Sequence, residues 1–263
     1  MTVDWHYTAT NDRGIAFGDG CFETIRLCRG KAPFWPQHKQ RLFRGLSVLG
    51  IHASEQQLDT LMAEAVQKKQ DNGIFKLIVT RGVGGRGYSC QQLTTAHYYP
   101  RVFPLALPKH EKYETGLKVG VCSFPLASQP RLAGIKHLNR LEQVLARQEV
   151  DNNEWDEGLL LDGAGAPVEL TAMNVFFRFP EGWWTSDLAL CGVAGIGREW
   201  VLKQHENILV SEKPPNTLDN VLEAFACNSV AGILPVRKLG QKHLSVGAVT
   251  REYQQRWNAI WHD

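Results

Sequence analysis

The chain has 263 residues, 43% of them hydrophobic and 21% charged, which is enough apolar material to bury a core of its own. Its formal net charge is only +2, with no long basic stretch, so no nucleic-acid partner is expected. The sequence has no apolar run of about 18 residues and no signal-peptide pattern, so we expect no membrane association and a cytoplasmic location. The six cysteines lack metal-ligand spacing and are expected to remain thiols.

Strands and helices mix in the first half of the chain. The segment CFETIRLC (21–28) alternates apolar and polar residues, as a half-buried strand does. Apolar residues at helical spacing predict two helices downstream. The second opens with a Ser-x-x-Gln pattern at Ser54 and carries an apolar face of Leu58, Leu61, Met62 and Ala65. The expected elements are a hairpin with arms 21–28 and 32–35, helices over 36–49 and 54–72, a strand over 74–80, a glycine-rich loop over 82–87 and an extended segment over 97–107.

The second half shows the same mixture. A helix predicted over 137–150 places Leu138, Leu141, Val144 and Leu145 on one face, which we expect to be buried. The other expected elements are a strand over 117–123, a hairpin with arms 158–161 and 168–170, strands over 174–179 and 207–211, and helices after Gly197, around 217–224 and over the last fifteen residues.

These elements follow no strict βαβ alternation, so the predicted fold class is α/β (α+β) with two lobes. The polar stretch PKHEKYETG has few apolar anchors and is interpreted as a linker. We therefore expect a smaller α/β domain over 1–107, a linker over 108–116 and a larger α/β domain over 117–263 that carries Lys136.

Gly82, Gly84 and Gly87 match the spacing GxGxxG directly after a predicted strand. A dinucleotide site needs a helix that begins inside this motif, and the residues that follow show no helical apolar stripe, so dinucleotide binding is not expected. The same loop carries Arg86, whose guanidinium is suited to hold a substrate carboxylate through two hydrogen bonds. An ordinary turn between strands is the alternative.

Lys136 and Glu169 are candidate catalytic groups, and local spacing leaves both open. Lys136 lies between Ile135 and Leu138 at a strand-to-helix junction, where it is either a solvated side chain or an amine that bonds a carbonyl compound. Glu169 either faces water at the edge of a hairpin or pairs with the ring nitrogen of pyridoxal phosphate.

The glycine-rich segment GVAGIGR (192–198) precedes a predicted helix, and a helix N-terminus can bind a phosphate through its N–H groups. A plain loop before a helix is the alternative. Arg41, on the first predicted helix, is either a solvated residue or a phosphate ligand. The histidines and acids form no HExxH-like cluster, so a metal site is not expected.

Taken in order, six segments resemble the fold-type-IV pyridoxal-phosphate enzymes, the group of D-amino acid aminotransferase, branched-chain aminotransferase and aminodeoxychorismate lyase. Together they span nearly the whole chain. They are FGDGCFETIR (17–26), HKQRL (38–42), IKHLNRLEQVLA (135–146), ELTAMNVF (169–176), GVAGIGR (192–198) and CNSVAGILPV (227–236). TRGVGGRGYS (80–89) and AGIKHLNRLEQVL (133–145) resemble the aminodeoxychorismate lyase branch in particular.

The resemblance implies a two-lobed, D-amino acid aminotransferase-like fold and the cofactor pyridoxal 5'-phosphate. Lys136 falls on the lysine that bonds the cofactor, Glu169 on the carboxylate that pairs with its pyridine nitrogen, and Val193 on an apolar residue that packs on its ring.

The resemblance also implies which residues hold the cofactor's phosphate. These positions fall on Arg41, on the backbone of Ile196 and Gly197, and on Ser229. Some relatives carry a threonine where this chain has Gly197, so only the backbone amide can serve there.

The function implied is a lyase that converts 4-amino-4-deoxychorismate to 4-aminobenzoate and pyruvate in folate biosynthesis. Arg86 and Arg26 are the candidate partners of the two substrate carboxylates. The family also implies a homodimer. An aminotransferase on the same scaffold, and a non-catalytic pyridoxal-phosphate-binding protein, remain the alternatives.

Overall fold

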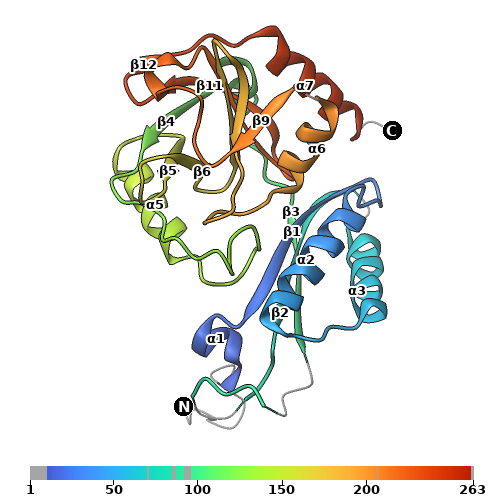
Figure 1. The fold of residues 1–263 in the computed structure, drawn as a ribbon. Helices are drawn as coiled ribbons and strands as arrows, with labels where there is room; N and C mark the ends of the chain where they lie inside the picture. Colours follow the sequence, from blue (N-terminus) through green and yellow to red (C-terminus); the bar gives the residue numbers. More distant parts are fainter. Residues whose placement is uncertain (1–10, 70, 85–86, 92–95, 206, 262–263) are drawn as a thin grey trace. The chain divides into compact units, whose positions relative to one another are not determined.

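The computed structural model describes residues 11–69, 71–84, 87–91, 96–205 and 207–261 (Figure 1). Their contacts divide the mixed α/β chain into two compact units. Unit 1 contains Met1–Ala106 and Ile135–Asn139, and unit 2 contains Leu107–Gly134 and Arg140–Asp263. Among the described residues, no helix combines the length and apolar character that crossing a membrane requires.

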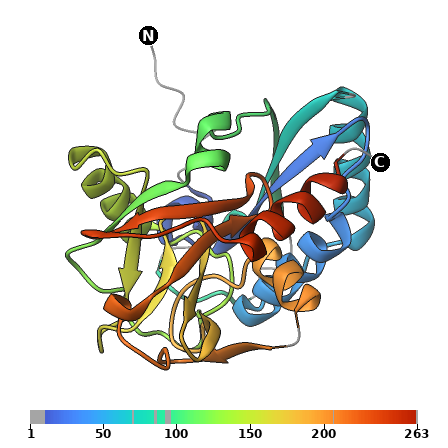
Figure 2. The same ribbon diagram turned by 90° about the horizontal axis from the view of Figure 1, so that it is seen from above.

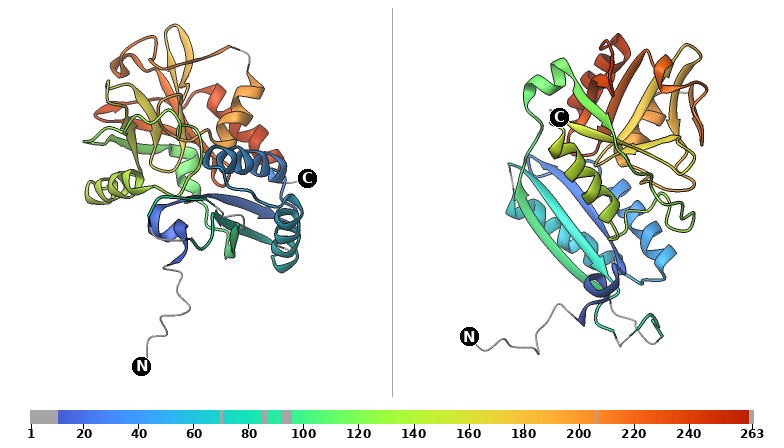
Figure 3. Two further views of the ribbon diagram at one scale, coloured as in Figure 1. Left: turned by 60° about the horizontal axis from the view of Figure 1, so that its bottom comes forward. Right: turned by 90° about the vertical axis from the view of Figure 1, so that its left-hand side faces the viewer.

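Unit 1 is a three-stranded antiparallel sheet in the order β1-β2-β3, with helices α2 and α3 packed on it (Figures 1 and 3). Its elements are α1 (Arg13–Phe17), β1 (Gly20–Cys28), α2 (Trp35–Leu49), α3 (Glu55–Lys68), β2 (Asn72–Thr80) and β3 (His97–Pro104).

The core of unit 1 lies between the sheet and its helices. The predicted apolar face of the second helix is confirmed, because Leu58, Leu61, Met62 and Ala65 of α3 are all buried. Each such leucine contributes roughly 1.5–3 kcal/mol by leaving water. Ser54 caps α3 by accepting a hydrogen bond from the Gln57 N–H at 3.2 Å, as its spacing predicts.

The predicted hairpin between residues 21–28 and 32–35 is wrong. After Cys28 the chain makes only a tight turn through Arg29 and Gly30, both with positive φ, and α2 begins at Trp35. The strand β1 instead pairs along its whole length with β2, from Gly20 opposite Thr80 onwards. Local alternation identifies the strand but contains no information about a partner some fifty residues away.

Unit 2 is built on a mixed nine-stranded sheet, with the path β6-β5-β4-β11-β10-β7-β8-β9 and β12 paired to β11. Helices α4 and α7 pack on β11, α5 on β5, and α6 on β10 and β7 (Figure 2). Its elements are α4 (His110–Thr115), β4 (Leu117–Val121), α5 (Leu141–Asn152), β5 (Glu157–Leu161), β6 (Pro167–Leu170), β7 (Asn174–Phe179), β8 (Gly182–Ser186), α6 (Ile196–Gln204), β9 (Ile208–Ser211), the 3-10 helix η2 (Leu218–Asn220), β10 (Glu223–Asn228), β11 (Gly232–Leu239), β12 (Lys242–His243) and α7 (Ala248–Ala259).

Two predicted helices of this half differ from the structure. The helix expected around 217–224 is a single 3-10 turn followed by strand β10, whose side chains are buried between two neighbouring strands. The helix expected over 137–150 begins only at Leu141, and its predicted buried face is wrong: Leu141, Val144 and Leu145 are 77%, 51% and 53% exposed. The core side of α5 is formed by Ala146 and Val150.

The contacts place two segments differently from the expected domain boundaries. Residues 108–116, interpreted as a linker, contain α4 and belong to unit 2, where the Tyr113 hydroxyl donates to the Ala231 carbonyl at 2.8 Å. The segment Ile135–Asn139, which carries Lys136, belongs to unit 1.

Candidate active site

Lys136 is held against strand β1 by main-chain hydrogen bonds. The Phe22 N–H donates to the Lys136 carbonyl at 3.0 Å, and the Leu138 N–H donates to the Gly20 carbonyl at 3.0 Å. The Lys136 ammonium lies 4.3 Å from the centre of the Phe22 ring, within the range of a cation–π contact. The backbone thus presents Lys136 from a short segment bridged to β1 rather than from the start of a helix.

Arg26 shares a sheet face with this ring. Side chains of β1 alternate between the two faces, so Phe22, Thr24 and Arg26, all half-buried, lie on one face, and Glu23 and Ile25 on the buried one. The face that carries the Lys136 contact therefore also carries Arg26, a candidate for the substrate carboxylates.

Arg41 projects from α2 and meets the buried carboxylate of Glu23. Arg41 Nε donates to Glu23 Oε1 at 2.8 Å and Arg41 Nη2 donates to Oε2, while His38 Nδ1 lies 2.6 Å from Oε2. Burial alone would raise the pKa of Glu23, but the charge of Arg41 and the hydrogen bonds from Arg41 and His38 outweigh it and lower the pKa to about 2. Burial lowers the pKa of His38, against the opposing effect of Glu23.

Glu169 is the centre of a second cluster, in unit 2. It is buried on β6, where its Oε2 accepts from the Val193 N–H at 2.8 Å and its Oε1 accepts from the Gln143 amide at 3.3 Å. The predicted residues Glu169 and Val193 are therefore in direct contact.

Asn174 fixes the loop that leads to α6. Its side-chain amide donates to the Val193 carbonyl at 2.8 Å, and its Oδ1 accepts from the Gly195 N–H at 3.1 Å. The first helical residues, Ile196 and Gly197, follow without a side-chain cap. Their N–H groups have no partner within the helix itself and carry the positive end of its dipole, which is the arrangement that binds anions.

Gly197 is required by a close approach of two backbones. A Cβ at Gly197 would lie 3.0–3.2 Å from the backbone of Asn228, so a larger residue would force α6 away from this turn. Ser229 follows in the same turn and is 9% exposed. The structure thus brings together Ile196, Gly197 and Ser229, three of the predicted phosphate-binding positions.

Arg86 lies outside the described residues. The chain just beyond it is anchored by Arg13 of α1, whose Nη1 donates to the Gly87 carbonyl at 2.9 Å and whose Nη2 donates to the Tyr88 carbonyl at 3.1 Å. Asp19 holds Arg13 in turn, accepting from its Nε at 2.9 Å.

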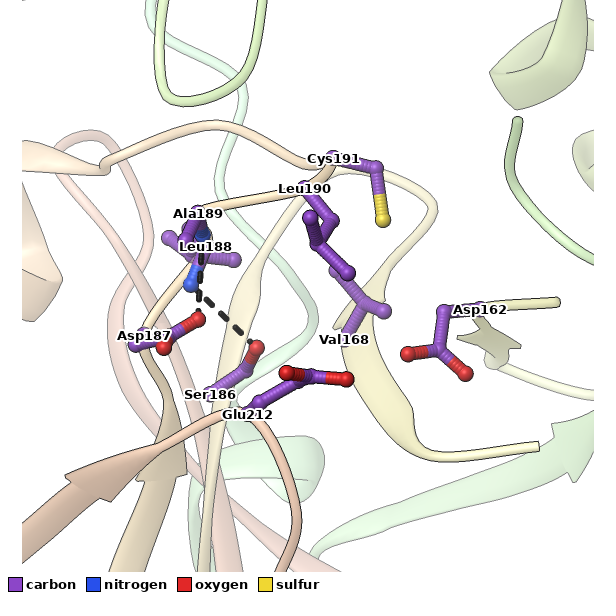
Figure 4. A pocket seen from close by; sticks show the side chains of 9 residues that line it. All are labelled: Asp162, Val168, Ser186, Asp187, Leu188, Ala189, Leu190, Cys191 and Glu212. Atoms are coloured by element: carbon purple, nitrogen blue, oxygen red, sulfur yellow. Dashed lines mark hydrogen bonds between the residues drawn. The ribbon is translucent and has the colours of Figure 1, made fainter. Parts of the chain in front are cut away.

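A small pocket of unit 2 is lined by none of the predicted site residues (Figure 4). Three carboxylates, those of Asp162, Asp187 and Glu212, stand around it with apolar side chains from the 188–191 turn. Within the described residues, no three His, Cys, Asp or Glu side chains are grouped to hold a metal ion. Because its lining includes none of the predicted residues, the pocket is not part of the candidate site.

Sequence reasoning missed four residues that orient the candidates: Glu23, His38, Gln143 and Asn174. Glu23 had a usable signal. It occupies an inward position of the alternating strand between Cys21 and Ile25, where a carboxylate needs a cationic partner. Gln143 and Asn174 contact residues 19 to 26 positions away, so no local sequence pattern predicts these contacts.

The chain matches the family model described as Amino-transferase class IV over residues 20–239. It is 33% identical to an aminodeoxychorismate lyase of Vibrio harveyi, covering 94% of each chain. Its structure is similar to the crystal structure of 4-amino-4-deoxychorismate lyase from Pseudomonas aeruginosa, with a TM-score of 0.91, 35% identity and coverage of 96% and 95%. A D-alanine aminotransferase of Bacillus licheniformis is 29% identical over 90% of this chain and 84% of its own length.

Proposed function

Because the chain belongs to the class IV aminotransferase family, we propose that it is a 4-amino-4-deoxychorismate lyase, which eliminates pyruvate from this substrate and leaves 4-aminobenzoate for folate biosynthesis. One observation carries the proposal: the Vibrio harveyi and Pseudomonas aeruginosa proteins, each more than 30% identical to this chain and aligned over more than nine-tenths of it, both bear this name. The aminotransferase described beside them is less similar.

The proposed cofactor is pyridoxal 5'-phosphate, and the chain's residues fit it. The aldehyde of this cofactor bonds to an amine, and Lys136 presents its amine beside the Phe22 ring. A carboxylate must keep its ring nitrogen protonated, and Glu169 is buried with both oxygens oriented by N–H donors. Val193, which contacts Glu169 through its backbone, is proposed to pack on the ring.

We propose that the ligands of the cofactor's phosphate are Arg41, the N–H groups of Ile196 and Gly197, and Ser229. The uncapped start of α6 supports this assignment, since an anion there satisfies N–H groups and the helix dipole together. The Glu23 carboxylate on Arg41 supports it as well, because it fixes the plane of the guanidinium.

Each residue then has a defined task. The cofactor supplies an electron sink when bound. Lys136 Nζ accepts the proton from the substrate carbon that bears the amino group. Glu169 holds the proton on the ring nitrogen. Arg86 and Arg26 orient the two substrate carboxylates. Because loss of the enolpyruvyl group makes the substrate ring aromatic, the elimination is strongly downhill and orientation is the main requirement.

The test is a product assay. The purified protein, loaded with pyridoxal phosphate, is given 4-amino-4-deoxychorismate, and separately a panel of D- and L-amino acids with 2-oxoglutarate. We expect pyruvate and 4-aminobenzoate to be released faster than any amino acid is transaminated. The reverse order makes the protein an aminotransferase, and no turnover in either assay makes it a binding protein.

We also propose that the protein is a homodimer working in the cytosol. The support for the dimer is the apolar row of Leu141, Val144 and Leu145 on α5, which a single chain leaves exposed.

A further inference from the structure

A carboxylate occupies an apolar position in unit 1. Glu23 is 0% exposed and lies on the inward row of β1, between the buried side chains of Cys21 and Ile25. An apolar residue of similar volume would avoid the loss of hydration that a buried charge suffers. Folding stability alone therefore gives no reason for a glutamate there.

Both oxygens of Glu23 are used to fix side chains of α2. Arg41 bonds it at two points, from Nε at 2.8 Å and from Nη2, so the plane of the guanidinium is set. His38 Nδ1 lies 2.6 Å from Oε2 and is the third nitrogen of α2 that contacts this carboxylate.

His38 acts as a neutral donor in this arrangement. An ionised carboxylate can only accept, so the proton lies on Nδ1. Burial lowers the pKa of His38, with the positive charges of Arg41 and Lys136 acting in the same direction and Glu23 against them. Nε2 is buried and makes no hydrogen bond within the described part of the chain. Leaving this acceptor without a hydrogen bond costs folding stability. The role that remains for the ring is to orient the Glu23 carboxylate through Nδ1.

We propose that Glu23 and His38 are positioning residues that hold the Arg41 guanidinium in the orientation required by the cofactor's phosphate. This inference rests on the proposed function, where Arg41 is a phosphate ligand. The competing view is that Glu23 is only a counter-charge for Arg41. The two views predict opposite signs, because removing a negative charge near a phosphate strengthens its binding, whereas loosening its ligand weakens it.

The experiment compares two ligands of the apo protein, pyridoxal 5'-phosphate and pyridoxal, which lacks the phosphate. In Glu23→Gln we expect the affinity for pyridoxal phosphate to fall about tenfold or more, as for loss of a charged hydrogen bond, and the affinity for pyridoxal to stay unchanged. In an Arg41→Met background the same substitution should have no further effect, because Glu23 acts through Arg41.

Glu223→Gln is the matched control. Glu223 is also buried, and it accepts from the Gly247 N–H at 3.1 Å and from Thr250 at the start of α7 in unit 2. Its replacement should lower the melting temperature without changing the ratio of the two affinities. If Glu23→Gln does not fold, the proposal is tested with two His38 variants. His38→Asn keeps a donor near the Nδ1 position and should retain the affinity for pyridoxal phosphate, which His38→Ala should lose.

A rise in pyridoxal-phosphate affinity in Glu23→Gln, an equal loss for both ligands, or an additive effect with Arg41→Met overturns the proposal. Equal affinities in the two His38 variants do so as well. A wild-type protein that binds pyridoxal phosphate but releases no pyruvate contradicts the lyase instead, and leaves the result for Glu23 standing.

Discussion

Lys136 is the residue whose chemistry is most directly testable. If its amine bonds the cofactor's aldehyde, the loaded protein should be yellow and borohydride should attach the pyridoxyl group permanently to Lys136, because only a covalent imine is reduced onto the protein. Peptide mapping of the reduced protein locates the label. Lys136→Ala should remove both the label and turnover. A label on another lysine, or none after full loading, means that the assignment is wrong.

Acid sensitivity is predicted from the Glu23 and His38 pair. Because the folded-state pKa of Glu23 is lowered from 4.5 to about 2, its contribution is complete above pH 4.5 and is lost as the pH falls towards 2. This contribution is roughly 3 kcal/mol. The pKa of His38 is also lowered, so the unfolded chain takes up a proton first and stability begins to fall below pH 6.5.

The measurement is the free energy of unfolding from urea titrations between pH 8 and 2, which covers the windows of both groups. In His38→Asn, which has no titrating ring, the loss that starts below pH 6.5 should be smaller than in the wild type. The same pH dependence in both proteins would show that other groups cause it.

At the scale of elements, the start of α6 depends on Gly197. An alanine Cβ there meets the Asn228 backbone at 3.0–3.2 Å, and backbone atoms cannot move aside as a flexible side chain does. Gly197→Ala should cost about 1–3 kcal/mol and weaken binding of pyridoxal phosphate, since α6 must shift away from Ser229. Gly163→Ala, in the β5–β6 turn, is the control, because nothing lies within 4 Å of a Cβ there. Equal melting temperatures and affinities in the two variants would refute the close approach.

At the scale of the whole molecule, the exposed row on α5 leads to a prediction about assembly. If Leu141, Val144 and Leu145 pack against a second copy, Leu145→Asp should shift the sedimentation coefficient from dimer towards monomer, because a charge in an apolar interface loses its hydration. Val121→Asp, at a 36% exposed position on β4 of the same unit, is the control. A wild type that sediments as a monomer at working concentration excludes the dimer.

The sequence by itself was sufficient to predict the elements whose signals are local. The cap at Ser54, the buried face of α3, the end of α2 before Gly50 and the arms of the β5–β6 hairpin all follow from patterns a few residues long. The order of six short segments along the chain was enough to indicate the family, which the match over residues 20–239 confirms.

Only the tertiary structure decided which segments meet. It paired β1 with β2 rather than with its neighbour in the chain, attached the segment of Lys136 to β1, and exposed the apolar row of α5. It also joined Glu23 to Arg41 and Glu169 to Val193, eighteen and twenty-four positions apart. The physical reason is the same in each case: periodicity and caps depend on neighbours within a turn or two, whereas pairing and burial depend on which distant surfaces remove each other from water.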